Sequence, residues 1–473
     1  MSIDTNPNAD SKPSRYLQGN YAPVFEELDE ADLEVIGHIP EALTGAYLRN
    51  GPNQQFTPLG RYHVFDGDGM IHAVSLDGGR ARYHNRFVES RGLLAERRAG
   101  HALYGGLSEF TFPDQAVIDE GGMMKNTANT NVIRHAGRIL ALMEGAPPTE
   151  LSTELDTLGE YNFDGQLAGA MTAHPKWDPE TGELLFFGYS PFPPYLRFHV
   201  ADASGRLIRN VDVTLPRSVM MHDFTVTRDH VVFFDLPAVF DFDAMMHGGT
   251  SITWQPQHGS RIGVLPRDAS QDDVTWFELD PFFVFHFLNS WDDGDTIVID
   301  GCRAPRMPVA FGDEVLTAAA HPTLHRWTVN LKLGSVTESQ LDDRPGDFPR
   351  VNHHRSGLAN QYGYVAAGPW TVDDVQFKSV IKYDLQAGTS QIHHYGGGGE
   401  HIECGEAVFA PDPAGTAEDD GWLINFVTDR ATEISELVIV DARDVEGDAV
   451  ARILMPQRVP TGFHGNWMPD QQY

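Results

Sequence analysis

The sequence predicts an all-β protein in which many short antiparallel strands form one large unit, and three observations support this. Short apolar runs rich in β-branched and aromatic residues recur along the chain, each bounded by Gly, Asp or Pro. The 46 Gly and 30 Pro are spread almost evenly, which indicates frequent turns. Long helical periodicity is scarce, and residues 92–102 are the best candidate for a short helix.

The expected strands share a short length and a turn on either side. The segment WDPETGELLFFG (177–188), for example, places an acidic, Gly-containing turn before an apolar run. No repeat of about 40–50 residues recurs, so the pattern alone leaves a sandwich array and a β-propeller open. In chain order the expected strands are RILALM (138–143), ELLFFG (183–188), HVVFFDL (230–236), TIVID (296–300), YGYVAA (362–367), WLINFVT (422–428) and ELVIVD (436–441).

We expect one folded domain, residues 21–473, after a flexible N-terminal tail, residues 1–20. The tail is rich in Asn, Asp, Ser and Pro, and no linker or change of composition divides the rest of the chain. With 473 residues, 41% of them hydrophobic, the chain can bury a large core.

The charge and the cysteines exclude several classes of function. Lys and Arg number 34 against 67 Asp and Glu, and the net charge of −33 disfavours nucleic acid as a partner. Cys302 and Cys404 form no CxxC pair, which excludes a thiolate zinc site and fits a reducing compartment. The N-terminus lacks a signal-peptide pattern, and no apolar run is long enough to span a bilayer. We therefore expect a cytoplasmic protein that contacts at most the surface of a membrane.

Four of the 21 histidines lie inside or beside strongly hydrophobic segments. An imidazole is costly to bury unless both ring nitrogens have partners, and a metal on one side with a carboxylate on the other satisfies both. Core histidines bonded to backbone are the alternative. Spacings of 48, 64 and 178 residues match no local zinc motif, so the residues alone do not join the four into one site. The four are His174, His222, His286 and His464.

Three carboxylates stand in similar apolar surroundings. Glu144 follows the expected strand RILALM, Asp347 lies in GDFPRVN, and Glu406 lies in CGEAVFAPDP. A buried carboxylate pairs with a cation or accepts an N–H, and a metal-bound histidine offers such a partner. A carboxylate at a strand end that faces water is the alternative for each. No GxSxG or HExxH motif supports a hydrolase or a zinc protease.

Ten segments stand in a fixed order along the chain: YLRNGPN (47–53), YHVFDGDGMIH (62–72), TANTNVI (127–133), LALMEG (140–145), TAHPKWDP (172–179), MMHDFTVT (220–227), LHRWTVNL (324–331), DFPRVN (347–352), GEAVFAPDP (405–413) and GFHGNW (462–467). Together they closely resemble the carotenoid cleavage oxygenase family. Its members are non-haem iron enzymes that split double bonds in carotenoids, apocarotenoids and stilbenes. The resemblance runs from about residue 48 to the last residues.

The resemblance implies a seven-bladed β-propeller, with a cap of loops and short helices over an iron on the axis. Carried over residue by residue, it implies that His174, His222, His286 and His464 bind one Fe(II) per chain, with dioxygen as co-substrate. Imidazole ligands suit iron among other metals, so the residue types alone do not name the metal.

The resemblance also implies that three carboxylates orient three of the histidines. The family's usual residue at the second carboxylate position is Glu. Because Asp347 is one methylene shorter, the sequence leaves open a direct bond to His286 and a bridge through water. Thr127 matches a residue whose methyl group crowds an open position of the iron, with an ordinary strand threonine as the alternative. Glu144 would orient His222, Asp347 would orient His286, and Glu406 would orient His464.

The implied reaction inserts dioxygen across one conjugated double bond and gives two carbonyl products. Stilbene-cleaving members carry a Lys just before the first of these Glu residues and a Tyr in a preceding loop, which hold a phenol hydroxyl. This chain has Met143 and Leu107 there, which favours a carotenoid or apocarotenoid. A stilbene dioxygenase, an iron-dependent isomerase and a lipid-binding propeller are the alternatives. The expected tunnel residues, each with core packing as the alternative, are Phe65, Leu107, Phe110, Met143 and Phe285.

A polyene substrate is nearly insoluble in water, so we expect an apolar tunnel mouth that touches a bilayer surface. Residues 188–198 and 237–246 crowd Phe, Pro, Met and Tyr between turns, with buried loops between blades as the alternative. Because the net charge is −33, such contact would be hydrophobic and nearly independent of salt. The sequence does not indicate the oligomeric state.

Overall fold

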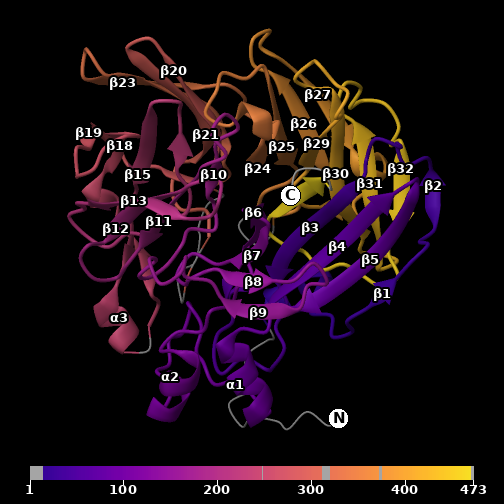
Figure 1. Ribbon diagram of the computed structural model, residues 1–473, viewed down its shortest axis with the longest axis horizontal. Helices are drawn as coiled ribbons and strands as arrows, with labels where there is room; N and C mark the ends of the chain where they lie inside the picture. Colours follow the sequence, from indigo (N-terminus) through magenta and orange to yellow (C-terminus); the bar gives the residue numbers. More distant parts are fainter. Residues whose placement is uncertain (1–13, 248, 310, 312–319, 372–374, 470–473) are drawn as a thin grey trace.

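Seven β-sheets stand around a common axis in the computed structural model (Figure 1). The structure describes residues 14–247, 249–309, 311, 320–371 and 375–469. Within each sheet the neighbouring strands are antiparallel, and the sheets follow one another around the ring in chain order. The predicted all-β class is therefore confirmed, as is the seven-bladed propeller.

Among the described residues, five blades have four strands each, and the first strand of each of these blades lies nearest the axis. In order from the axis, the first of these blades contains β6 (Asn131–His135), β7 (Arg138–Leu142), β8 (Thr149–Leu151) and β9 (Thr157–Glu160). The second contains β10 (Lys176–Trp177), β11 (Leu184–Tyr189), β12 (Leu196–Ala201) and β13 (Leu207–Val213). The third contains β14 (Thr225–Val226), β15 (His230–Asp235), β18 (Ser260–Pro266) and β19 (Thr275–Leu279). The last two contain β20 (Phe283–Asp293), β21 (Thr296–Ala304), β22 (Thr323–Asn330) and β23 (Ser335–Gln340), then β24 (Gly346–Arg350), β25 (Tyr362–Ala367), β26 (Ser379–Asp384) and β27 (Thr389–His394).

The two remaining blades join the beginning of the chain to its end. The C-terminal strand β33 (Gly465–Pro469) pairs with β3 (Gly45–Pro52), and Tyr47 lies opposite Trp467. This pairing closes the ring without a covalent link. The sheet that contains β3 and β33 also contains β4 (Gly69–Asp77), β5 (Arg80–Phe87) and β1 (Asp29–Glu30). The neighbouring sheet contains β28 (Ile402–Cys404), β29 (Val408–Pro411), β30 (Gly421–Asp429), β31 (Ile434–Asp441), β32 (Ala451–Leu454) and β2 (Val35–Gly37).

Hydrophobic clusters fill the spaces between neighbouring blades. One lies between the β14 and β20 blades and includes Phe234, Phe287 and Trp327, and comparable clusters lie at the other interfaces. Because a blade is covered on both faces, its inner strands are continuously apolar, whereas an outer strand such as β23 is mostly exposed. All seven expected strands are present, and the largest difference is that β21 continues to Ala304.

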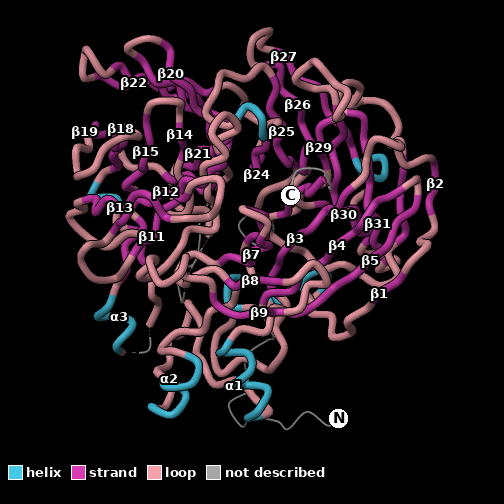
Figure 2. The backbone as a smooth tube through the Cα atoms, viewed as in Figure 1, coloured by secondary structure: helices cyan, strands magenta, loops and turns pink. Residues whose placement is uncertain are grey.

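The helices lie outside the ring of blades, on one side of it (Figures 1 and 2). Helix α1 (Arg91–Ala99) confirms the predicted helix but is shorter, because Gly100 adopts a left-handed conformation with φ of 77°. The remaining short elements are α2 (Gln115–Gly121), α3 (Phe242–Met246), the hairpin β16 (Ala238–Phe240) and β17 (Ile252–Trp254), and the 3-10 turns η1 (Arg15–Leu17), η2 (Gly19–Tyr21), η3 (Val64–Asp66), η4 (Pro256–His258), η5 (His353–Arg355) and η6 (Tyr395–Gly398). No helix among the described residues is long and apolar enough to cross a membrane.

Contact between the N-terminal segment and the propeller begins before residue 21, where we expected the domain to start. The Ser14 hydroxyl donates to the carbonyl of Tyr62, and the buried Asn20 side chain donates to Glu403. Residues 1–13 of the expected tail lie outside the described residues.

Candidate metal centre

The innermost strands of four blades bring four histidines to the axis. His286 lies on β20, and His174 and His222 lie two and three residues before β10 and β14. His464 directly precedes β33. Because each of these strands is the axial strand of its blade, histidines from distant parts of the sequence meet in space.

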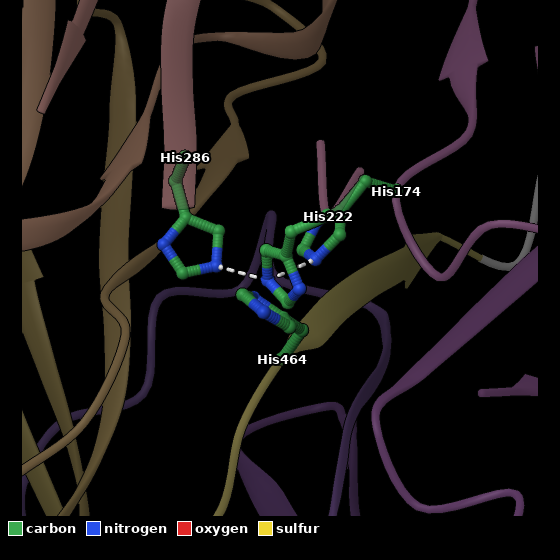
Figure 3. Close-up of side chains that lie close together, drawn as sticks. All are labelled: His174, His222, His286 and His464. Atoms are coloured by element: carbon green, nitrogen blue, oxygen red, sulfur yellow. Dashed lines mark hydrogen bonds between the residues drawn. The ribbon is translucent and has the colours of Figure 1, made fainter. Parts of the chain in front are cut away.

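The four imidazole rings face one another (Figure 3), and their ligand-capable nitrogen atoms lie within 4.8 Å of one another. The Nε2 atom of His222 is 3.0 Å from Nε2 of His174 and 3.1 Å from Nε2 of His286. All four side chains are buried.

Three carboxylates approach the opposite ring nitrogens of three of these histidines. Since a carboxylate only accepts hydrogen bonds, each Nδ1 carries the proton and donates it, and each Nε2 keeps a lone pair that faces the cluster. Nδ1 of His286 lies 2.8 Å from Oδ1 of Asp347, Nδ1 of His464 lies 3.0 Å from Oε1 of Glu406, and Nδ1 of His222 is paired with Oε1 of Glu144.

Asp347 reaches His286 directly, which answers the question that the shorter side chain left open. Strand β24 has an irregular register between Asp347 and Arg350, and Phe348 there has a φ of 53°, uncommon for a residue with a side chain. The Phe348 amide donates to Oδ1 of Asp347, and the Phe348 ring stacks on His286 at 5.0 Å between centroids. The irregular backbone thus fixes both the carboxylate and the ring beside this histidine.

The arrangement of nitrogen atoms fits a metal ion. The Nε2 lone pairs of His222 and His286, 3.1 Å apart, repel each other unless a cation lies between them. Two nitrogens at about 2.1 Å from one ion, at right angles to each other, are about 3.0 Å apart, which matches the observed spacing. Right-angled ligands also leave further positions on the ion for small molecules. Iron suits these donors, as do zinc, copper and nickel, so the ligand role of each histidine stays a prediction.

Burial and charge shift the pKa values of three groups of the site, His174, His464 and Glu406, toward the protonation states that metal binding needs. Burial lowers the pKa of His174 well below its usual value, and burial lowers that of His464 to about 4. Burial acts to raise the pKa of Glu406, but Arg350 and His464 outweigh it and lower this pKa to about 2. At neutral pH these two imidazoles are therefore neutral and this carboxylate is ionised.

A cavity of about 810 Å³ adjoins the histidine cluster, and its walls include His222, His286 and His464. Thr127 also lines it, and among the described residues its hydroxyl has no hydrogen-bond partner. The structure thus brings Thr127 and the expected tunnel residues to the same cavity, and their roles stay predictions. The tunnel residues are Phe65, Leu107, Phe110, Met143 and Phe285.

The cavity has an apolar rim on the side of the helices. Phe192, from the segment 188–198, and Met246, from the segment 237–246, are 63% and 65% exposed and line the cavity. The Phe192 ring stacks on Phe242 of α3 at 5.7 Å. Phe240 of the second segment also lines the cavity, but it packs against the hydrophobic cluster between two blades. Other exposed apolar residues that line the cavity are Leu59, Phe112, Met123 and Met124.

The sequence analysis missed three residues of the site. Phe348 and Arg350 lie in the motif DFPRVN, in which only Asp347 was expected to belong to the site. Arg350 lies 3.6 Å from Glu406. Tyr189, at the end of β11, donates to Oε2 of Glu144 at 3.1 Å. Nothing in the local sequence distinguishes Tyr189 from a strand tyrosine, because its partner lies on the neighbouring blade.

Residues 21–469 match the protein family described as "Retinal pigment epithelial membrane protein". Among curated proteins, the chain is 36% identical to a "Carotenoid 9,10(9',10')-cleavage dioxygenase" of Crocus sativus, over 98% of this chain and 90% of that protein. It is also 36% identical to a "Carotenoid cleavage oxygenase" of Mycobacterium tuberculosis, over 98% of this chain and 99% of that protein.

Solved structures show the same architecture. Lignostilbene dioxygenase of Pseudomonas brassicacearum superposes with a TM-score of 0.89 at 30% identity, and covers 97% of this chain and 99% of that one. A variant of Synechocystis apocarotenoid oxygenase superposes with a TM-score of 0.86 at 28% identity, and covers 95% of this chain and 98% of that one.

Proposed function

This chain belongs to the carotenoid cleavage oxygenase family, and from that premise we propose that it is an iron-dependent dioxygenase of carotenoids or apocarotenoids. It would split one conjugated carbon–carbon double bond and give two carbonyl products. The observation that carries this proposal is a cluster of four buried histidines in the wall of a large, mainly apolar cavity.

The proposed ligands of one Fe(II) per chain are His174, His222, His286 and His464. When bound, the iron supplies the binding and activation of dioxygen. The protein's own side chains would position the ligands: the carboxylates behind the histidines hold the imidazole rings in one tautomer and one orientation. The proposed orienting residues are Glu144, Asp347 and Glu406.

The cavity walls would position the polyene and exclude water. Phe65 and Phe285 lie edge to face at 6.5 Å, and Phe285 also contacts the ring of His222, so these rings can hold a flat conjugated chain beside the metal. Thr127 would restrict the space at the metal on the cavity side. A dry cavity also protects reactive species from side reactions with water.

Hydroxystilbenes are a second candidate class of substrate. The high structural similarity to a lignostilbene dioxygenase supports a hydroxystilbene as the second candidate. Against it, Met143 and Leu107 line the cavity at the positions where we expect stilbene-cleaving relatives to carry Lys and Tyr. A phenol hydroxyl buried against these side chains would lose a hydrogen bond, which costs about 1–3 kcal/mol, or roughly 5- to 150-fold in affinity.

We expect the iron-loaded protein to cleave an apocarotenal with a kcat/KM at least about 10-fold higher than that for a hydroxystilbene of similar size. Product mass spectrometry under ¹⁸O₂ checks this, because a dioxygenase labels both carbonyl products. An isomerase would return an unlabelled substrate isomer, and a lipid-binding protein would return the substrate unchanged. A hydroxystilbene cleaved faster than every apocarotenal would replace the first candidate with the second.

We further propose that the apolar rim of the cavity contacts a membrane surface from which the substrate enters. The support is the exposure of Phe192 and Met246 at the cavity, together with the insolubility of polyenes in water. Because the net charge is −33, the contact would depend on apolar area rather than on anionic lipid.

Phe192→Asp combined with Met246→Asp is expected to slow cleavage of a polyene held in zwitterionic liposomes by about 10-fold or more, since each change removes exposed apolar area that the membrane would bury. Cleavage of the same substrate in detergent should be nearly unchanged. The control is Leu158→Asp with Leu333→Asp, two exposed leucines that do not line the cavity. Equal slowing in liposomes and detergent would mean that Phe192 and Met246 shape the cavity and not a membrane contact.

A further inference from the structure

The three carboxylates behind the histidines are held in different ways. Glu406 accepts the backbone amide of Gly465 on Oε2 at 3.0 Å and lies near Arg350. Asp347 accepts the backbone amide of Phe348 at 2.9 Å. Backbone amides of axial strands are fixed by the fold itself, so these two carboxylates need no further side chain to hold them.

Glu144 has no such backbone donor among the described residues. It follows β7, and its Oε2 accepts from the hydroxyl of Tyr189, which ends β11 on the next blade, at 3.1 Å. Its Oε1 is paired with His222. Its side chain is 13% exposed, against 4% for Asp347 and 2% for Glu406, and it lines the cavity. Of the three carboxylates, Glu144 is therefore the one with the greatest freedom to turn away from its histidine.

The Tyr189 ring is packed in a position from which its hydroxyl can hold the carboxylate of Glu144. It packs against Phe240 of β16 at 5.6 Å and against Phe187 at 6.5 Å between centroids. Burial raises the pKa of Tyr189 well above its usual value, and Glu144 raises it further, so the hydroxyl keeps its proton and acts as the donor. A hydrogen bond to a charged acceptor is among the stronger ones that a side chain makes.

We propose that Tyr189 is a positioning residue for the metal centre: its hydroxyl fixes Glu144, and Glu144 in turn fixes the imidazole of His222. This inference rests on the proposed function, because it assumes that His222 binds a metal. Tyr189 acts through Glu144 and does not itself touch the metal-facing nitrogen. The hydrogen bond between Tyr189 and Glu144 thereby links the β10 blade to the β6 blade beside His222, where the cavity reaches the histidine cluster.

The test is Tyr189→Phe, which removes only the hydroxyl. We expect release of Fe(II) to an excess of ferrous chelator to become about 3- to 10-fold faster, and kcat to fall by a similar factor with KM nearly unchanged. The matched control is Tyr161→Phe, because the Tyr161 hydroxyl donates to the Gly205 carbonyl and the residue does not line the cavity. An increase in KM with unchanged metal release would mean that Tyr189 contacts the substrate instead, and would overturn the proposal.

A second comparison separates positioning from a general loss of packing. In a Glu144→Gln background, Tyr189→Phe should change metal release by less than about 2-fold, because the group through which Tyr189 acts is already altered. Equal effects in both backgrounds would overturn the proposal. Metal release needs no substrate, so it tests Tyr189 even if the protein cleaves neither polyenes nor stilbenes. A native protein that retains no metal would instead refute the proposed function.

Discussion

Replacement of His222 or His464 by alanine is expected to remove bound iron and to reduce cleavage to background. Each of these imidazoles is buried, faces the cluster with an unprotonated Nε2, and is paired with a carboxylate on its other nitrogen. Losing one leaves three nitrogen donors and a carboxylate without its histidine partner, so metal affinity should fall. Metal analysis by mass spectrometry and the product assay measure the two losses separately.

The control for this pair is His230→Ala. His230 is also paired with a carboxylate, since its Nδ1 lies 2.8 Å from Asp292, but it does not line the cavity. This variant should keep its iron and its activity. Full iron in His222→Ala or His464→Ala would show that the ligand assignment is wrong.

The second large effect is expected for Asp347→Asn, which keeps the shape of the side chain and removes its charge. Asp347 is 4% exposed and bonds directly to His286, so little water can replace the lost interaction. Loss of such a partner costs about 10- to 100-fold in metal affinity or activity, and this deep burial favours the upper end. Iron content, the rate of iron release and the cleavage rate should all be measured on the same preparation.

Asp292→Asn is the matched control, because it alters the same type of pair outside the cavity. If Asp347→Asn retained iron as firmly as the native protein, the charge of Asp347 would not support the metal centre. The carboxylate would then serve only to hold the irregular turn at Phe348.

The strands that the sequence predicts are mostly those that lie second from the axis. β7, β11, β15, β21, β25 and β30 are covered on both faces by neighbouring blades, so their residues form continuous apolar runs. Some of the other strands escape prediction because they lack such a run. β10 and β14 are two residues long and stand beside polar site residues, and the exposed outer strand β23 has no apolar pattern.

The candidate site could be predicted only in part. The surroundings of His174 and Glu406 mark them as unusual, but no spacing rule could join them, because the ring brings together residues from different blades. The resemblance to a known family supplied that connection. The direct bond of Asp347 and the contact of Tyr189 depend on how the backbone bends at β24 and where β11 ends. Such details arise between blades and leave no local pattern in the sequence.

The pairing of β33 with β3 has a consequence for the closure of the ring. His464 directly precedes β33, so the strand pairing that completes the sheet of β3 also brings the fourth histidine to the axis. While β33 is unpaired, the axis lacks one nitrogen donor and the edge of β3 stays open. A metal ion that requires all four nitrogens would therefore bind only the closed ring, and its binding would favour the closed ring over the open one.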